Sequence, residues 1–421
     1  MNERSVSVNG ISIYSLTNPN LRSFCLSLYV RAGSIFEDLS NNGISHLFEH
    51  VVFRNIKNKY ENFYELLAMH GLCFQGSTYK KFVSFTIDGP QHEFDFAIEI
   101  LCGLFDEIKL TSHDFNNEKG RIKAEIREKD RRSSLDFYFD SIVWKNSEVE
   151  KIVLGYCKTV DRVSVKKINE FRQKVLSAGN CFVYATGNIS DENLDALNKK
   201  ISELDISQSN PGFTNTVTVN NEFFHREKKI WIKNNYWHYI LIGFDVDCSK
   251  YPGGVYGLLY ALLFNGDKAL VYNYLSEDNP IIYSYDSTFE QYDNVGNINF
   301  SFEVDRNKIE DVFKTVVELL NAAKDGRFNF EANLNYEMFN WELDLDNPDN
   351  LNWNMAYYNH ILKTQSIDYS DEFYGRFRVT KEQIIDAAKY IFRRCNMTVA
   401  VKGDRKKINA EAIEKILESL D

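Results

Sequence analysis

The stretch FDFAIEILCGLFDEI, residues 94–108, decides the fold because a second copy of its pattern lies further along the chain. Its apolar residues recur at helical spacing along one stripe. Shifting by 215 residues gives IEDVFKTVVELLNAA, residues 309–323, with the same stripe in the same order. This pair of stretches predicts two equivalent amphipathic helices.

Two more matches support an internal duplication. The alternating apolar residues of 83–87 predict a strand, and the same shift places them on the alternating residues of 298–302. Upstream, NGISHLFEHVVFRN at residues 42–55 matches GGVYGLLYALLFNG at 253–266 with a shift of 211. Three matches in order at nearly one offset indicate a repeated unit of about 200 residues.

We therefore predict an α+β protein made of two homologous domains, each a mixed β-sheet with helices packed on one face. The expected boundaries are residues 1–205 for the first domain and 222–421 for the second. Between them, the polar segment 206–221 contains a Pro-Gly pair and is the predicted linker. The later elements of the repeat are predicted as a helix at 114–132 and as strands at 181–187 and 397–403.

Length and composition exclude several classes of protein. The 421 residues correspond to two or three domains, and 44% hydrophobic with 26% charged residues is typical of a soluble globular chain. A net charge of −11 argues against nucleic-acid binding. The longest apolar run, near 255–264, is shorter than the roughly 18 residues of a membrane span. No secretory signal is visible at the N-terminus, so we expect a cytoplasmic protein.

The seven cysteines are scattered and form no CxxC pair, so they predict neither a zinc ribbon nor a disulfide framework.

A group of histidines and acids has the spacing of a metal site. His46, Glu49 and His50 form H-x-x-E-H in a predicted helix, where residues four apart share a face. Two imidazoles on one face can bind one zinc ion, and Glu49 can then act as a general base. The alternative is a helix with incidental histidines, although the pattern arises by accident in only roughly one such chain in a hundred.

A third protein ligand is needed for a firm zinc site. Glu125 lies 75 residues after His50, in a predicted helix. Glu118 precedes it by seven residues and shares its face, so one can bind metal while the other supports the site. Glu128 is the competing candidate.

The second half of the chain is an internal control for this site. At a shift of 211, the three motif positions become Gly257, Tyr260 and Ala261, which cannot bind zinc. The sequence therefore predicts one metal site per chain.

H-x-x-E-H is the inverzincin motif. With a Glu some 75 residues downstream and two duplicated halves, the chain resembles the insulinase-like (pitrilysin-type) zinc peptidases, which include the mitochondrial and two-domain bacterial processing peptidases. The resemblance is most direct in VRAGSIFEDLSNNGISHLFEHVVFRN, residues 30–55, and in residues 154–190. It implies that His46, His50 and Glu125 bind zinc. It also implies that Glu49 is the general base and that Glu118 supports the site.

The resemblance also implies a substrate strand. In the family the peptide lies extended along an edge strand near the metal, and the matching segment here is FQGST, with Gln75 where the family usually has Asn. The alternative is an ordinary edge strand. The predicted substrate-binding residues are Phe74, Gln75, Gly76, Ser77, Thr78 and Tyr283.

The second half departs from the family pattern. Active chains carry an Arg and, seven residues later, a Tyr that hold the substrate. In LSEDNPIIYS, residues 275–284, Tyr283 is present but the Arg position is Ser276. We therefore expect a second, non-identical homologous subunit to supply this pair, with the present chain as the zinc subunit of a heterodimer.

Two classes of function follow. The first is a zinc endopeptidase that cleaves small peptides or the leaders of precursor peptides, including ribosomally made ones. The alternative is a non-catalytic scaffold or peptide-holding subunit of the same fold. Buried imidazoles and acids around an empty site would cost stability, so the presence of the full set of candidate residues favours the peptidase.

Overall fold

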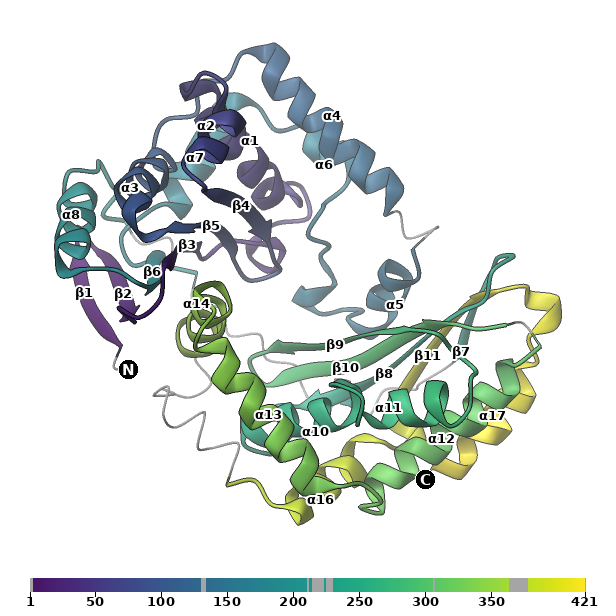
Figure 1. The fold of residues 1–421 in the computed structure, drawn as a ribbon. Helices are drawn as coiled ribbons and strands as arrows, with labels where there is room; N and C mark the ends of the chain where they lie inside the picture. Colours follow the sequence, from purple (N-terminus) through teal and green to yellow (C-terminus); the bar gives the residue numbers. More distant parts are fainter. Residues whose placement is uncertain are drawn as a thin grey trace. The chain divides into compact units, whose positions relative to one another are not determined.

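The computed structural model describes residues 3–129, 134–209, 212–213, 223–224, 230–305, 307–362 and 378–420. The chain forms two compact units. The first unit comprises Met1–Lys129, Glu148–Asn215 and Leu343–Gln365, and the second comprises Asp130–Ser147, Thr216–Glu342 and Ser366–Asp421. Figure 1 shows a sheet and a set of helices in each unit.

The first unit is built on a six-stranded sheet with the order β1-β2-β6-β3-β5-β4. β2 and β6 run parallel and the other neighbours run antiparallel, so the sheet is mixed as predicted. β4 pairs with β5 and forms one edge. The strands are β1 (Arg4–Val8), β2 (Ile11–Thr17), β3 (Ser23–Val30), β4 (Cys73–Thr78), β5 (Val83–Pro90) and β6 (Cys181–Gly187).

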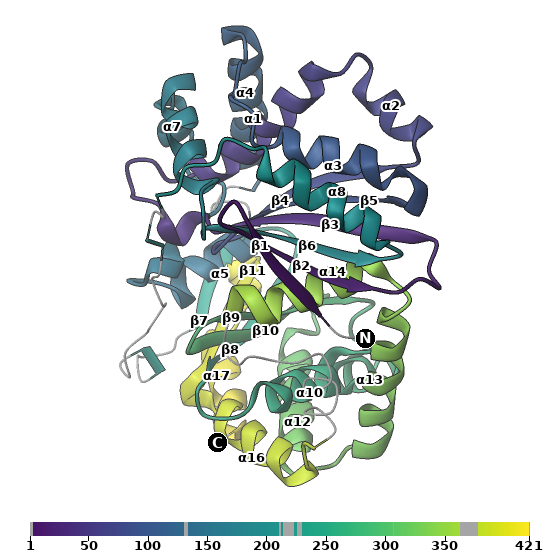
Figure 2. The ribbon, with the colours of Figure 1, turned by 90° about the vertical axis from the view of Figure 1, so that its left-hand side faces the viewer.

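Most helices of the first unit cover one face of this sheet. Alternate residues of β3, such as Phe24 and Leu26, point into the core, where Phe24 meets Phe94 of α3 edge to face. In Figure 2, α3 and α8 lie on this side of the strands and α14 lies on the other. The helices are α1 (Ile44–Lys59), α2 (Phe63–Met69), α3 (Phe94–Gly103), α4 (Ser112–Glu128), α6 (Cys157–Asp161), α7 (Val165–Val175), α8 (Asp191–Ser202) and α14 (Pro348–Met355).

The second unit repeats this topology, and its described residues form counterparts of β2 to β6. Its sheet has the order β7-β11-β8-β10-β9, with β7 and β11 parallel. The strands are β7 (Ile230–Asn234), β8 (Tyr239–Asp247), β9 (Tyr285–Tyr292), β10 (Val295–Glu303) and β11 (Met397–Gly403). The helices are α5 (Leu135–Val143), α10 (Gly253–Phe264), α11 (Leu270–Tyr272), α12 (Ile309–Lys324), α13 (Phe330–Asp344), α16 (Lys381–Ile391) and α17 (Ala410–Leu417).

The predicted duplication is confirmed element by element. The matched stretches form α3 and α12, the alternating segments form β5 and β10, and the third pair forms α1 and α10. The strands predicted at 181–187 and 397–403 are β6 and β11 with the same bounds. The helix predicted at 114–132 is α4, which begins at Ser112 and ends at Glu128.

The compact units differ from the contiguous ranges 1–205 and 222–421, because two short helices are exchanged between the sequence halves. α14 packs on β3 and β6 of the first unit, where Asn352 accepts a 2.9 Å hydrogen bond from the Tyr29 hydroxyl. α5 packs on β8 and β11 of the second unit. The two helices start 213 residues apart (348 − 135), close to the repeat offset. Most of the predicted linker 206–221 lies outside the described residues.

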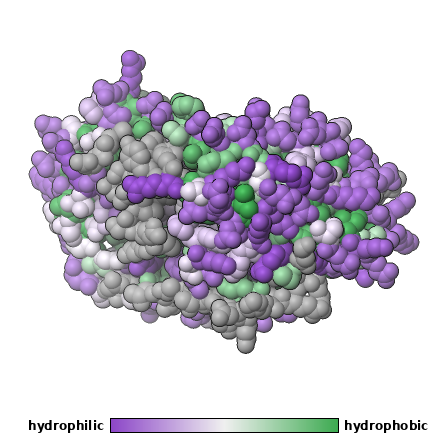
Figure 3. Space-filling view, turned by 90° about the horizontal axis from the view of Figure 1, so that it is seen from below, coloured by the Kyte–Doolittle hydropathy of each residue, from purple (hydrophilic) through white to green (hydrophobic). Residues whose placement is uncertain are grey.

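No helix in the described ranges is long and apolar enough to cross a membrane. On the face shown in Figure 3, hydrophilic side chains predominate and the hydrophobic ones lie in small groups.

Candidate metal and catalytic site

The helix that carries the motif has a fixed start. α1 follows Gly43, whose φ of 96° lies in the left-handed region that favours glycine, and no N-cap side chain bonds to the helix. The buried carboxylate of Glu37 takes that role: Gly43 N donates at 2.7 Å and Ser45 N at 2.8 Å. An acid at this end also matches the helix dipole. The first turn, which includes His46, is therefore held in place.

His46, His50 and Glu125 meet between α1 and α4. Each offers one potential ligand atom, and these atoms all lie within 4.8 Å of one another. His46 Nε2 is 3.6 Å from Glu125 Oε2. Zinc with ligand distances of about 2.1 Å in a tetrahedron separates its donors by about 3.4 Å, which is close to the separation of His46 Nε2 and Glu125 Oε2. Two imidazoles and one carboxylate fit a catalytic zinc ion that keeps one open position.

His46 is already in the protonation state that a metal ligand needs. Burial, together with the nearby His50 and Lys129, lowers the pKa of His46 to about 3, so its imidazole is neutral at physiological pH. Its Nδ1 is buried and has no hydrogen-bond partner among the described residues. Nε2, which faces Glu125, is therefore the ring nitrogen that is available to a metal ion.

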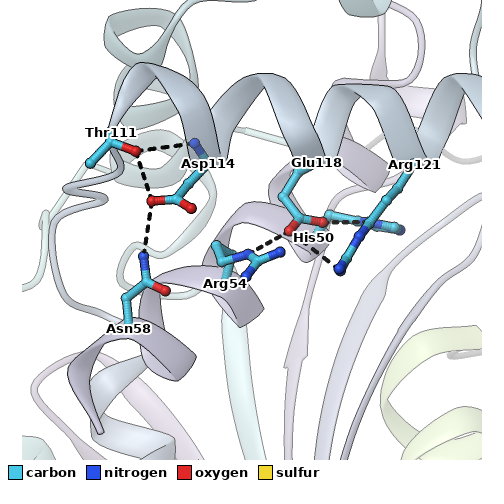
Figure 4. A network of polar contacts seen from close by, with 7 residues as sticks. All are labelled: His50, Arg54, Asn58, Thr111, Asp114, Glu118 and Arg121. Carbon is cyan, nitrogen blue, oxygen red and sulfur yellow. Dashed lines mark hydrogen bonds and ion pairs between the residues drawn. The ribbon is translucent and has the colours of Figure 1, made fainter. Parts of the chain in front are cut away.

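Glu118 supports His50 from α4 (Figure 4). Its Oε2 lies 3.5 Å from His50 Nδ1, and Arg54 Nε donates a 2.6 Å hydrogen bond to its Oε1. Although burial raises the pKa of Glu118, its contacts with His50 and Arg54 outweigh this and lower the pKa below the usual value. A buried, ionised carboxylate can fix the orientation of the imidazole.

Sequence reasoning missed Arg54. The signal was available, because Arg54 follows His50 by four residues and so shares its face of α1. Glu128, the competing candidate, is exposed and is not one of the three clustered potential ligands.

The carboxylate of Glu49 lies against β4. Thr78 Oγ1 donates a 2.8 Å hydrogen bond to Glu49 Oε2, and a Cβ placed on Gly76 would lie 2.9 Å from Oε1. Burial and the nearby Glu125 raise the pKa of Glu49, although His50 and Thr78 oppose this shift. A carboxylate with a raised pKa is a stronger base, which suits proton transfer near neutral pH.

The other predicted substrate residues differ in how far their side chains are exposed. Phe74 is buried and stacks on Phe53 with ring centroids 4.6 Å apart, so only its backbone is free to contact a peptide. Gln75 is exposed on the edge strand, while Ser77 is half-buried. Tyr283 belongs to the second unit, where its side chain is 97% exposed.

A second cluster of potential ligands consists of Cys25, Asp88 and Asp349. The Cys25 thiol is buried and donates a long contact of 3.8 Å to Asp349 Oδ1. Burial raises the pKa of Asp88 to about 6, and the nearby Asp349 adds to this effect. The thiol of Cys25 on β3 thus contacts two acids, Asp88 of β5 and Asp349 at the start of α14.

Asp88 yields a pH-dependent prediction. Because its pKa is higher in the folded chain than in the unfolded chain, folding stability falls as pH rises from about 4 to about 6 and stays lower above that range. Asp88→Asn should therefore raise the free energy of unfolding at pH 7.5, by up to about 3 kcal/mol, but not at pH 4. Thermal melts across this pH range measure the effect, with the exposed Glu99→Gln as the control. An equal shift of both variants would contradict the assignment.

Two family models match the chain. Residues 13–155 match the insulinase model of peptidase family M16, and residues 162–332 match the model described as the peptidase M16 inactive domain. The second label agrees with the replacement of the motif by Gly257, Tyr260 and Ala261 on α10.

Individual relatives agree. An uncharacterized zinc protease, YmxG, of Bacillus subtilis is 21% identical over 332 residues, covering 77% of this chain and 79% of that protein. The mitochondrial-processing peptidase subunit beta of Saccharomyces cerevisiae is 23% identical over 190 residues, covering 44% of this chain and 41% of that subunit. The crystal structure of a protease from Helicobacter pylori has the same fold, with a TM-score of 0.82 and 18% sequence identity. The match covers 95% of this chain and 99% of that one. The chain therefore belongs to the insulinase (M16) family of peptidases.

Proposed function

We propose that the chain is a zinc-dependent endopeptidase. The observation that carries this proposal is the meeting of His46, His50 and Glu125 in one cluster, with the Glu49 carboxylate on the same helix turn. Several relatives are named zinc proteases, which supports the choice of metal and reaction. A scaffold would have no use for a neutral, buried His46 beside the carboxylate of Glu125.

The residues divide the work of peptide hydrolysis. A zinc ion held by His46, His50 and Glu125 would supply the Lewis acidity that polarises the scissile carbonyl and the attacking water. Glu49 accepts the proton of the water on Oε1, since Oε2 is held by Thr78. The same carboxyl group then delivers the proton to the leaving nitrogen. The free edge of β4 orients the peptide through backbone hydrogen bonds.

Metal removal tests this proposal. After chelation the chain should lose cleavage of a synthetic peptide pool, with products followed by mass spectrometry. One equivalent of zinc should restore cleavage and raise the melting temperature, because an ion that binds the folded state alone stabilises it. Cleavage that survives complete zinc removal would refute the metal assignment. Zinc binding without any cleavage, with or without a partner subunit, would instead favour a peptide-holding role.

The substrate and partner are part of the same proposal. Residues 275–284 contain Tyr283 but no basic residue, so a second homologous subunit would have to supply the missing cation that grips the peptide. The yeast relative is itself named as a subunit, which supports this arrangement. We infer that the substrates are small peptides or leaders of precursor peptides. In the assay above, the chain alone should be weakly active and should gain activity when a homologous partner is added.

A further inference from the structure

The end of the edge strand β4 bonds directly to the candidate base. Thr78 is the last residue of β4, and its hydroxyl donates a 2.8 Å hydrogen bond to Glu49 Oε2. The carboxylate of Glu49 makes no other hydrogen bond with the described residues, so this one bond orients it. The strand on which the peptide would lie therefore also holds the base.

Gly76 completes this arrangement from the same face of the strand. Residues two apart in a strand point to the same side, so positions 74, 76 and 78 all face α1. Phe74 fills its place in the core, whereas Gly76 leaves a space that the Glu49 side chain occupies. A Cβ on Gly76 would lie 2.9 Å from Oε1, 3.0 Å from Cγ and 3.2 Å from Cδ of Glu49. The carboxylate thus rests over the backbone of Gly76 with one oxygen held by Thr78.

We propose that Thr78 is a positioning residue for proton transfer, because it holds Glu49 Oε2 and so leaves Oε1 to accept the proton. This inference rests on the proposed function, and it changes the role expected for Thr78 from binding substrate to orienting the base. A glutamate side chain has three rotatable bonds, so loss of its single hydrogen bond would let the carboxylate leave the productive geometry. Misplacement of a reacting group by about 1 Å can lower a rate about a hundredfold.

The two roles predict different kinetics. If Thr78 orients the base, removing its hydroxyl lowers kcat and leaves KM nearly unchanged, since the peptide still pairs with the strand backbone. If Thr78 binds substrate, KM rises and kcat remains. Thr78→Val has nearly the same shape and keeps a β-branched residue in the strand, but it cannot donate the bond. Thr78→Ser restores a donor.

The test compares Thr78→Val and Thr78→Ser with the wild-type chain, in the assembly that gives activity. Thr78→Ala is measured beside them as a second variant without a hydroxyl, in case valine disturbs the strand. Thr86→Val is the matched control, because Thr86 lies on neighbouring β5 and bonds to Ser27 Oγ at 3.0 Å instead. Zinc content and melting temperature are recorded for every variant.

We expect kcat to fall roughly ten- to a hundredfold in Thr78→Val and Thr78→Ala, with KM within about twofold of the wild type and zinc content unchanged. Thr78→Ser and Thr86→Val should stay near the wild-type rate. A crystal structure of zinc-free Thr78→Val should show the Glu49 carboxylate displaced from Gly76. Wild-type kcat in both hydroxyl-free variants, an effect on KM alone, or no rescue by serine would overturn the positioning role. Failure of the wild-type chain to cleave with zinc bound would refute the proposed function, independently of these comparisons.

Discussion

Glu49→Gln is expected to lower kcat by roughly a hundred- to ten-thousandfold, the range that a positioned general base contributes. The amide has almost the same shape as the carboxylate, and its oxygen can still accept the hydrogen bond from Thr78. It cannot accept a proton. Because Glu49 is not one of the three candidate metal ligands, the variant should bind zinc as the wild type does.

Two measurements make this expectation specific. Zinc content by elemental analysis should equal that of the wild type, and single-turnover cleavage should show the loss in the chemical step. Glu61→Gln, which changes an exposed acid near the end of α1, serves as the control and should retain full activity. If Glu49→Gln cleaves at the wild-type rate, the proton acceptor is a different group and the proposed mechanism is wrong.

The parts of the site that local periodicity describes could be predicted from the sequence. His46, Glu49 and His50 lie within one turn and a half of α1, so their common orientation follows from helix geometry alone. The sheets were predictable for a similar reason, since the same alternation appears twice and must bury the same face twice. Choosing Glu125 over Glu128 needed the spacing and the family resemblance. The structure brings Glu125 to His46 because α4 packs along α1.

Other contacts had no sequence signal, because they depend on which elements become neighbours. The bond from Thr78 to Glu49 joins a strand end to a helix across 29 residues. The exchange of α5 and α14 depends on where two short helices find an uncovered sheet face, which no local pattern encodes. Asn352 illustrates this, since its partners Tyr29 and Tyr184 lie 323 and 168 residues away in the chain.

Glu125→Ala is expected to abolish zinc binding at the concentrations that saturate the wild type, and activity with it. Removing a group that only supports a metal ligand costs about 10- to 100-fold in affinity, so removing a ligand itself should cost more. Glu118→Gln should fall in that smaller range, because Glu118 contacts His50 Nδ1 and is not in the cluster. The wild type, Glu118→Gln and Glu125→Ala should therefore form a series of decreasing zinc affinity.

Glu128→Ala decides whether this series reports metal coordination or only damage to α4. Glu128 lies on the same helix three residues later but is exposed, so its loss should leave zinc affinity and cleavage unchanged. Zinc should raise the melting temperature of Glu128→Ala as it does for the wild type, and should have no effect on Glu125→Ala. If both variants bind zinc equally well, the two imidazoles must have another oxygen donor, and α4 does not complete the site.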